Sequence, residues 1–123
     1  TGEAATLSTE ERDRVVSTVV VTAGGRVPVM AGATHNDTRL AVEEARRISG
    51  LGVTWLLSAT PYYNRPTPEG RFAHYEAIAN ATPLPIIVYN VPGRTGCNVD
   101  AATLAKLATI PTIIGVKEAS GNM

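Results

Sequence analysis

Residues 86–96 read IIVYNVPGRTG, an apolar run followed at once by a polar loop. The run from Ile86 to Tyr89 is apolar without interruption, whereas the loop carries Asn90 and Arg94 among Pro and Gly residues. Uninterrupted apolar runs are typical of strands in parallel sheets, because such strands are covered on both faces. The stretch therefore predicts a buried parallel strand whose carboxyl end opens into a polar loop.

The same pattern occurs four times along the chain. Apolar runs begin near Val27, Val53, Ile86 and Ile113. Their spacing of roughly 25 to 35 residues is the length of one β-α-β unit, and helical patterns fill the intervals. We therefore expect an α/β fold with a parallel sheet and helices on both of its faces.

Each helical pattern starts with a capping signal. The first is a capping box, in which Glu11 follows Ser8 by three residues, ahead of an apolar stripe of valines that ends at Gly24. The later helices are expected to start at N-cap residues, namely Asp37 or Asn36, Thr67 followed by Pro68, and Asp100. These signals place one helix before the first strand and one in each interval between strands.

Two parallel architectures fit this order, a doubly wound open sheet and a (β/α)8 TIM barrel. Every loop after a strand carries reactive or polar groups, whereas the loops after helices hold mainly Gly, Pro and small residues. A barrel brings the carboxyl ends of all its strands to one site, whereas an open sheet concentrates its ligand contacts at one switch point. The loops therefore favour the barrel.

A complete barrel has about 250 residues, so the 123 residues are expected to be about half of one. We interpret residues 1–123 as a partial catalytic domain that runs from the loop after barrel strand 2 to strand 6. Such a segment would expose two unpaired strand edges. Taken alone, it is expected to aggregate or to stay partly unfolded.

The composition argues for an ordinary globular protein, with no formal net charge and 44% hydrophobic residues. Scattered Lys and Arg residues argue against nucleic acid as a partner. No apolar run is long enough to span a membrane and no signal peptide precedes the fold, so a cytoplasmic location is expected. Cys97 is the only cysteine, and no glycine-rich nucleotide motif occurs, so neither a metal nor a cofactor is expected.

Lys117 ends the last apolar run, and a lysine at a strand end is usually a solvated charge. Burial at a barrel rim would disfavour the ammonium form and leave an amine that attacks ketones to form a Schiff base. Tyr89 ends the preceding strand, so its hydroxyl would reach the same mouth and transfer protons. Arg94 lies in a loop stiffened by Pro92 and can bind a substrate carboxylate. Residues 62–64 form a rigid aromatic loop with two tyrosines. One tyrosine is expected to pack at a subunit interface and the other to act in the site.

Four segments carry a more specific signature: TGEAATL (residues 1–7), TPYYNRP (60–66), YNVPGRTG (89–96) and GVKEASG (115–121). In this order they resemble the dihydrodipicolinate synthase members of the dihydrodipicolinate synthase / N-acetylneuraminate lyase family. The resemblance implies a (β/α)8 lyase of lysine and diaminopimelate biosynthesis. It condenses pyruvate with L-aspartate 4-semialdehyde to 4-hydroxy-tetrahydrodipicolinate and forms homotetramers built from tight dimers.

The resemblance also implies a role for each matching residue. Lys117 would form the Schiff base with pyruvate, and Tyr89 would donate and accept protons. Tyr63 would be the relay tyrosine that inserts into a neighbouring subunit's site. Thr1 would bind the pyruvate carboxylate, and Arg94 would receive the carboxylate of the semialdehyde. The family's relay threonine precedes the position of Thr1, so the segment alone is expected to be inactive.

The same resemblance bears on feedback inhibition. Members inhibited by lysine carry an acidic residue where Leu40 stands, although Ala5, Asn36 and Tyr62 match other parts of the inhibitor site. A leucine cannot bind the ammonium group of the effector. Weak or absent inhibition by lysine is therefore expected.

Two alternatives remain open. N-acetylneuraminate lyase and keto-deoxy sugar acid aldolases share the lysine and its tyrosine, but they generally lack the Val-Pro-Gly-Arg-Thr loop that contains Arg94. A non-catalytic regulatory or assembly protein would be expected to lose Lys117, Tyr89 or Tyr63, and all three are present. Arg94 therefore discriminates among the enzymes, and the other three residues argue for an enzyme.

Overall fold

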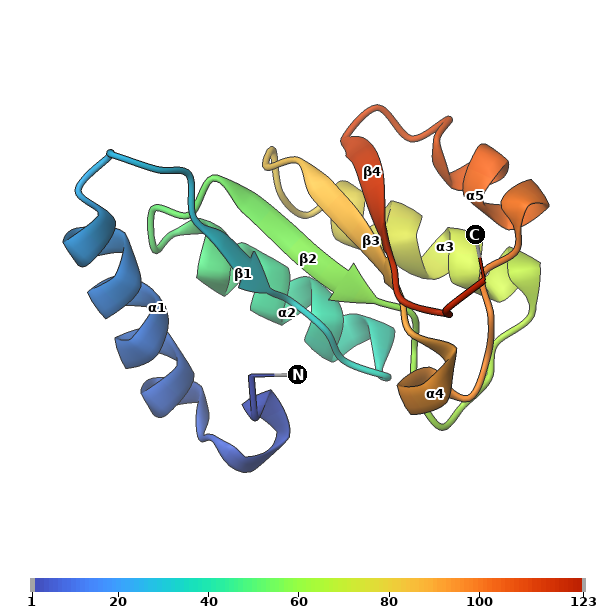
Figure 1. Ribbon diagram of the computed structural model, residues 1–123, viewed down its shortest axis with the longest axis horizontal. Coiled ribbons are helices and arrows are strands. Elements are labelled where there is room, and N and C mark those ends of the chain that lie inside the picture. Colours follow the sequence, from blue (N-terminus) through green and yellow to red (C-terminus); the bar gives the residue numbers. More distant parts are fainter. Residues whose placement is uncertain (1, 123) are drawn as a thin grey trace.

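A computed structural model describes residues 2–122, which form one parallel sheet with helices packed against it (Figure 1). The strands are β1 (Met30–Gly32), β2 (Trp55–Ala59), β3 (Ile86–Asn90) and β4 (Ile113–Glu118). They lie in the order β1-β2-β3-β4, and every neighbouring pair is parallel. A doubly wound sheet reverses its strand order at a switch point, whereas this sheet follows the chain throughout, as a barrel does.

The helices are η1 (Ala4–Thr6), α1 (Thr9–Ala23), α2 (Thr38–Ser49), α3 (Pro68–Ala79), α4 (Pro92–Thr95) and α5 (Ala101–Leu107). Of these, α1, α2, α3 and α5 begin at expected caps. Ser8 and Glu11 form the predicted capping box, and Asp37, rather than Asn36, caps α2. No helix among the described residues is long and apolar enough to cross a membrane.

Three details differ from the expectation. The first strand begins at Met30 rather than near Val27, because Pro28 has no N–H for a ladder and the carbonyl of Val29 already accepts hydrogen bonds from the turn before β2. The second begins at Trp55 rather than near Val53. The loop after β3 contains a single helical turn, α4, which starts at a proline and ends at left-handed Gly96.

The helices cover one face of the sheet, so the expectation of helices on both faces is wrong for the described residues (Figure 1). Alternate strand residues such as Leu56, Ile86 and Val88 are fully buried against α2, α3 and α5. The residues between them, among them Leu57 and Tyr89, face the other side. In a barrel that second face is the interior, which side chains rather than helices fill.

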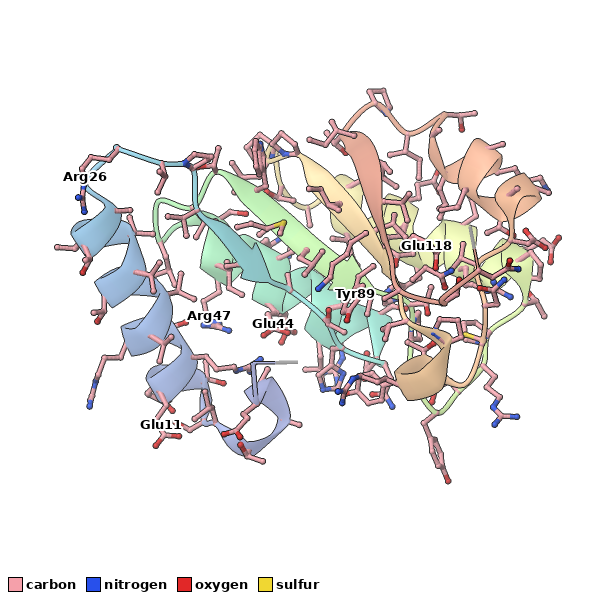
Figure 2. The ribbon with its side chains drawn as sticks, in the orientation of Figure 1. Glu11, Arg26, Glu44, Arg47, Tyr89 and Glu118 are labelled. Carbon is pink, nitrogen blue, oxygen red and sulfur yellow. The ribbon has the colours of Figure 1, made fainter. Side chains whose placement is uncertain are left out.

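Helix α1 joins the rest of the fold through two kinds of contact. Val16 and Val20 pack against the core cluster of β1, β2 and α2. Ion pairs join Arg12 to Glu44 and Arg47 to Asp13, which connects α1 with α2 (Figure 2). Burial raises the pKa of the Glu44 carboxyl, although Arg12 opposes the effect. The outer edges of β1 and β4 pair with no other described strand, as in a partial barrel.

Candidate active site

The parallel register of β3 and β4 brings Tyr89 and Lys117 together. Their Cα atoms are direct partners across the two strands. The Lys117 Nζ lies 4.1 Å from the centroid of the Tyr89 ring, a distance at which a cation is attracted to the face of an aromatic ring. Both residues therefore lie at the carboxyl end of the sheet, on the face away from the helices.

The two side chains differ in exposure. Tyr89 is only 8% exposed. Lys117 is exposed, contrary to the burial expected at a barrel rim. The reason is that β4 is an edge strand among the described residues, so nothing covers its outer side. The pair has an amine and a phenol within reach of each other, which are a nucleophile and a proton-transfer group.

Behind this pair lies a hydrogen-bonded polar group. Asn90 is 1% exposed, and its Nδ2 donates to Asn98 Oδ1 and to Glu118 Oε2, each at 2.8 Å. Its Oδ1 accepts from the backbone N–H of Val99 at 3.1 Å. Hydrogen bonds from Asn90 and from Ser120 hold the pKa of Glu118 below its usual range. Asn90 and Glu118 directly follow Tyr89 and Lys117 and are Cα partners, so this group lies on the opposite face of the two strands from the pair.

Arg94 lies on α4, directly after the carboxyl end of β3. Its side chain is exposed and makes no hydrogen bond or ion pair with other residues in the range 2–122. The guanidinium is thus available for a carboxylate, which it can bind through two parallel N–H groups. The helical turn of α4 and the left-handed Gly96 that ends it decide where this side chain stands.

Tyr63 stands apart from Tyr89 and Lys117. It is 89% exposed and has a left-handed backbone with φ of 69°. The loop around it is nevertheless fastened to two neighbours. Asn64 Nδ2 donates to the carbonyl of Asn36 at 2.8 Å, and the Arg65 guanidinium lies close against Gly96. The loop is therefore fixed by its neighbours, and the Tyr63 side chain extends outward from it. Thr1 lies outside the described residues.

Sequence reasoning missed Arg71, which connects two loops of the carboxyl end. It is buried on α3, where its Nε donates to the Pro66 carbonyl at 3.2 Å and its NH1 donates to the Asn98 carbonyl at 2.6 Å. The signal was available, because Arg71 shares the buried face of α3 with Tyr75 and Ile78 at helical spacing. A charged residue in such a stripe indicates a buried partner.

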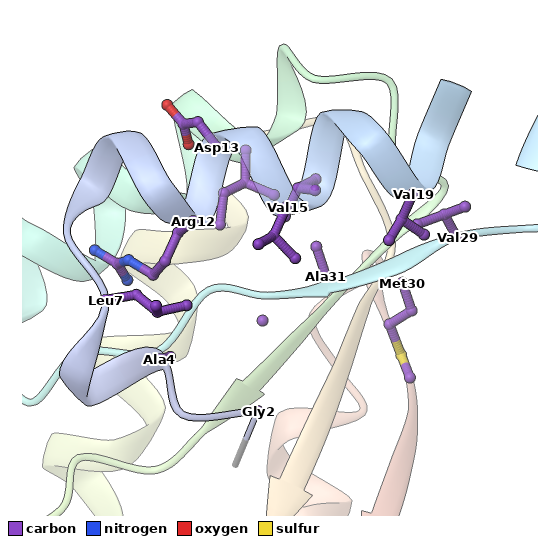
Figure 3. A pocket seen from close by; sticks show the side chains of 13 residues that line it. Gly2, Ala4, Leu7, Arg12, Asp13, Val15, Val19, Val29, Met30 and Ala31 are labelled. Atoms are coloured by element: carbon purple, nitrogen blue, oxygen red, sulfur yellow. The ribbon is translucent and has the colours of Figure 1, made fainter. Parts of the chain in front are cut away.

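A pocket of about 300 Å³ lies elsewhere, between α1 and β1 (Figure 3). Its lining is mainly apolar and includes Val15, Val19 and Met30, with Arg12 and Asp13 as the charged members. The pocket contains neither Tyr89 nor Lys117. Val15 and Val19 of α1 thus line this pocket beside the unpaired edge of β1, Val20 packs on the core, and Val16 does both. Among residues 2–122, no cluster of three His, Cys, Asp or Glu side chains is present to hold a metal ion.

Comparison with known proteins decides the family. The model of the dihydrodipicolinate synthetase family matches residues 1–123, the whole chain. The chain belongs to the dihydrodipicolinate synthetase family. Over 123 residues it is 50% identical to 4-hydroxy-tetrahydrodipicolinate synthase 1 of Halalkalibacterium halodurans and 53% identical to 4-hydroxy-tetrahydrodipicolinate synthase of Sodalis glossinidius.

Solved structures of the dihydrodipicolinate synthetase family support the fold as well. The chain superimposes on a chloride-inhibited dihydrodipicolinate synthase from Acinetobacter baumannii, complexed with pyruvate, with a TM-score of 0.96 and 48% sequence identity. The match covers 98% of this chain and 42% of that one. The chain likewise spans 42% of the length of the two relatives above. The parallel sheet is therefore part of a (β/α)8 barrel.

Proposed function

We propose that the chain is part of a 4-hydroxy-tetrahydrodipicolinate synthase, a lyase that condenses pyruvate with L-aspartate 4-semialdehyde. The observation that carries the proposal is the amine of Lys117 over the ring of Tyr89 at the carboxyl end of the sheet. Barrel enzymes carry their chemistry at this end. Residues 1–123 are the part of the catalytic domain that supplies the amine.

In the proposed reaction the Lys117 ammonium first loses a proton, and the free amine attacks the ketone carbon of pyruvate. The resulting carbinolamine loses water to give the Schiff base, and the Tyr89 hydroxyl donates and accepts the protons that these steps move. Loss of a methyl proton then gives an enamine, whose carbon attacks the aldehyde of the semialdehyde. The iminium nitrogen of the Schiff base takes up the electron pair when the methyl proton leaves, and the enamine nitrogen returns that pair as the new carbon–carbon bond forms and the aldehyde oxygen accepts the electrons.

Four further assignments complete the proposal. Arg94 binds the carboxylate of the semialdehyde, supported by its unpaired guanidinium beside β3. Tyr63 is the relay tyrosine, supported by its outward position, from which it enters the site of a neighbouring subunit. Thr1 binds the pyruvate carboxylate. The protein acts as a cytoplasmic homotetramer of two tight dimers.

Lysine is proposed to inhibit weakly or not at all. Asn36 and Tyr62 lie in loops that contact each other through Asn64, but Leu40 in the first turn of α2 offers no carboxylate for an ammonium group. Activity of the complete enzyme measured against lysine tests this. Inhibition at sub-millimolar lysine would contradict it.

Reductive trapping tests the central claim. The complete enzyme is incubated with pyruvate, treated with borohydride and digested, and the peptides are weighed by mass spectrometry. Residues 1–123 contain two lysines, Lys106 and Lys117, so Lys106 is an internal control. The mass increment of a reduced pyruvyl group is expected on the peptide with Lys117. An unmodified Lys117 peptide would contradict the mechanism.

Turnover with aspartate semialdehyde against N-acetylneuraminate then separates the proposed enzyme from its relatives. The proposal expects activity with the semialdehyde. The Val-Pro-Gly-Arg-Thr loop around Arg94 supports this choice.

A further inference from the structure

The carboxyl ends of β3 and β4 are joined by a side-chain contact as well as by the backbone. Residues alternate between the two faces of a strand. Tyr89 and Lys117 therefore share one face, and their successors Asn90 and Glu118 share the other. Asn90 and Glu118 are also Cα partners, and Asn90 Nδ2 donates to Glu118 Oε2 at 2.8 Å.

The backbone ladder between the two strands is irregular at its start. Ile86 pairs with Ile113, but Ile87 pairs with Gly115, so one residue is extra on β4. The last ladder bond runs from the Ala119 N–H to the Asn90 carbonyl at 2.8 Å. A slip of one residue moves every side chain of a strand to the other face. Such a slip would carry Lys117 to the helix side, away from Tyr89, so the register at this end matters for the site.

Asn90 also connects this register to the loop after β2, which belongs to the preceding unit. Its Nδ2 donates to Asn98 Oδ1, and the Asn98 carbonyl accepts from Arg71 NH1. Arg71 Nε donates to the Pro66 carbonyl, at the end of the loop that carries Tyr63. The buried side-chain amide of Asn90 thus links the strands that carry Tyr89 and Lys117 to the loop that carries Tyr63.

We propose that Asn90 is a positioning residue, which holds Lys117 over Tyr89 through its hydrogen bond to Glu118. This inference rests on the proposed Schiff-base function. Both amide protons of Asn90 are used, one by a charged acceptor and one by Asn98, and its oxygen accepts from Val99. A charged acceptor makes the bond to Glu118 stronger than one between neutral groups. Both N–H groups of the Asn90 amide are therefore in use, and its oxygen has at least one of its two acceptor positions filled.

The arrangement permits a complementation test in the complete enzyme. Asn90→Asp sets a carboxylate against the Glu118 carboxylate and removes the donor. Adding Glu118→Gln restores one donor and one acceptor and the original net charge, and the exposed Asn98 amide can turn its NH2 group inward. Glu118→Ala is the further single variant, because it removes the acceptor and leaves the hydrogen bonds of Asn90 to Asn98 and Val99 in place.

A matched control exists at the opposite end of the sheet. Ser49 Oγ and Thr82 Oγ1 share a hydrogen bond of 2.6 Å between the end of α2 and the loop after α3. Thr82→Val removes this bond far from Lys117. It is expected to lower the melting temperature and to leave the chemistry unchanged.

The readouts are the rate of borohydride-trapped adduct at saturating pyruvate, kcat and KM for pyruvate, and the melting temperature. Asn90→Asp and Glu118→Ala are expected to slow trapping and kcat by at least about tenfold, because a small misplacement of a reacting group has effects of this size or larger. The double variant is expected to recover most of the rate. KM is expected to change less than kcat, since the group touches no substrate.

Each contrary result has a distinct meaning. Wild-type trapping rates in folded Asn90→Asp or Glu118→Ala would overturn the positioning role, as would a double variant no faster than Asn90→Asp alone. Should Asn90→Asp fail to fold, Glu118→Ala decides. Absence of any adduct in the wild-type enzyme would instead overturn the proposed function.

Discussion

The two ends of the sheet are built differently. At the carboxyl end, polar side chains connect segments that are distant in the sequence: Arg71 donates to the loops after β2 and β3, and Asn90 donates to Glu118 at the end of β4. At the amino end, hydroxyl groups make side-chain hydrogen bonds, between Ser49 and Thr82 and from the backbone N–H groups of Val29 and Leu84 to nearby threonines, and the connections are short turns. The carboxyl end thus requires particular polar side chains, whereas the amino end depends mainly on turns.

The backbone shows the same contrast. Non-glycine residues with positive φ are Glu3, Tyr63 and Arg65 among the described residues, and all lie in segments at the carboxyl end. At the amino end the left-handed positions, such as Gly24 and Gly52, are glycines. A left-handed side chain costs about 1 to 2 kcal/mol. Unfavourable backbone conformations are therefore accepted only where the proposed site lies, which is the usual place for them.

The strongest test exchanges one lysine at each end. Lys117→Arg keeps a cation over the Tyr89 ring but has no nucleophilic amine, so kcat of the complete enzyme is expected to fall on the order of 10⁴-fold. Lys106→Arg, in the last turn of α5 at the amino end, is expected to keep full activity. An active Lys117→Arg enzyme would show that catalysis does not need the amine at the carboxyl end of the sheet. Melting curves check that both variants fold.

Two tyrosines allow the next comparison. Tyr89→Phe keeps the ring and loses the hydroxyl, so kcat is expected to fall by about 10²- to 10³-fold with little loss of stability. Tyr75→Phe removes a buried hydroxyl that donates to the Ser58 carbonyl at 2.9 Å, at a cost of about 1 to 2 kcal/mol of unfolding free energy and little of kcat. Kinetics and denaturant unfolding measure the two effects. Equal losses of activity would contradict the role of Tyr89.

Acid is expected to lower the unfolding free energy by disturbing the contact between α3 and the start of α2. His74 on α3 shares a 2.8 Å hydrogen bond with Thr38 at the start of α2, and burial lowers the pKa of His74 to about 4. The unfolded chain, with a pKa of about 6.5, binds the proton first. The stabilising effect is therefore complete above pH 6.5 and is lost as pH falls toward 4, by about 3 kcal/mol.

Unfolding free energies of the complete protein between pH 7 and pH 4 test this. His74→Gln is expected to remove most of that dependence, while Ser49→Ala at the amino end leaves it intact, because hydroxyl groups do not titrate in this range. The same acid dependence in wild type and His74→Gln would assign the effect to other groups.

The smallest expected effect compares two glycines. Gly96 and Gly52 have φ of 75° and 85°, so an alanine at either is expected to cost about 1 to 2 kcal/mol. A Cβ at Gly96 would lie 2.9 Å from Arg65 Nε, and one at Gly52 would lie 3.3 Å from a Val20 methyl. Gly96→Ala should therefore also displace the Tyr63 loop and lower kcat severalfold. Gly52→Ala should lower only the melting temperature, and a kcat change there would count against the contrast.

Local signals predicted much of the fold correctly. Ser8, Thr67 and Asp100 cap helices as expected, because capping needs only residues a few positions apart. The apolar run ending at Tyr89 is a buried parallel strand. The strand starting near Val27 was predicted too early, because propensity ignored the missing N–H of Pro28.

Contacts between residues that are far apart in the sequence were harder to predict from it. Nothing near Arg71 in the sequence identifies Pro66 and Asn98 as its acceptors, since these meet only when two loops fold back on α3. The exposure of Lys117 follows from the edge position of β4, which strand propensity does not reveal. The roles of Lys117, Tyr89, Tyr63, Arg94 and Thr1 stay predictions.

The sequence by itself determined the family, the order of strands and helices, and the residues delivered to strand ends. These depend on short-range patterns and on motifs that stand in one order along the chain. Only the tertiary structure decided that Lys117 lies over Tyr89, because that contact requires the register of two strands that α4 and α5 separate in the sequence, including the irregularity after Ile86. Register results from the sum of cross-strand contacts, with Asn90 and Glu118 among them, and no single segment contains that sum.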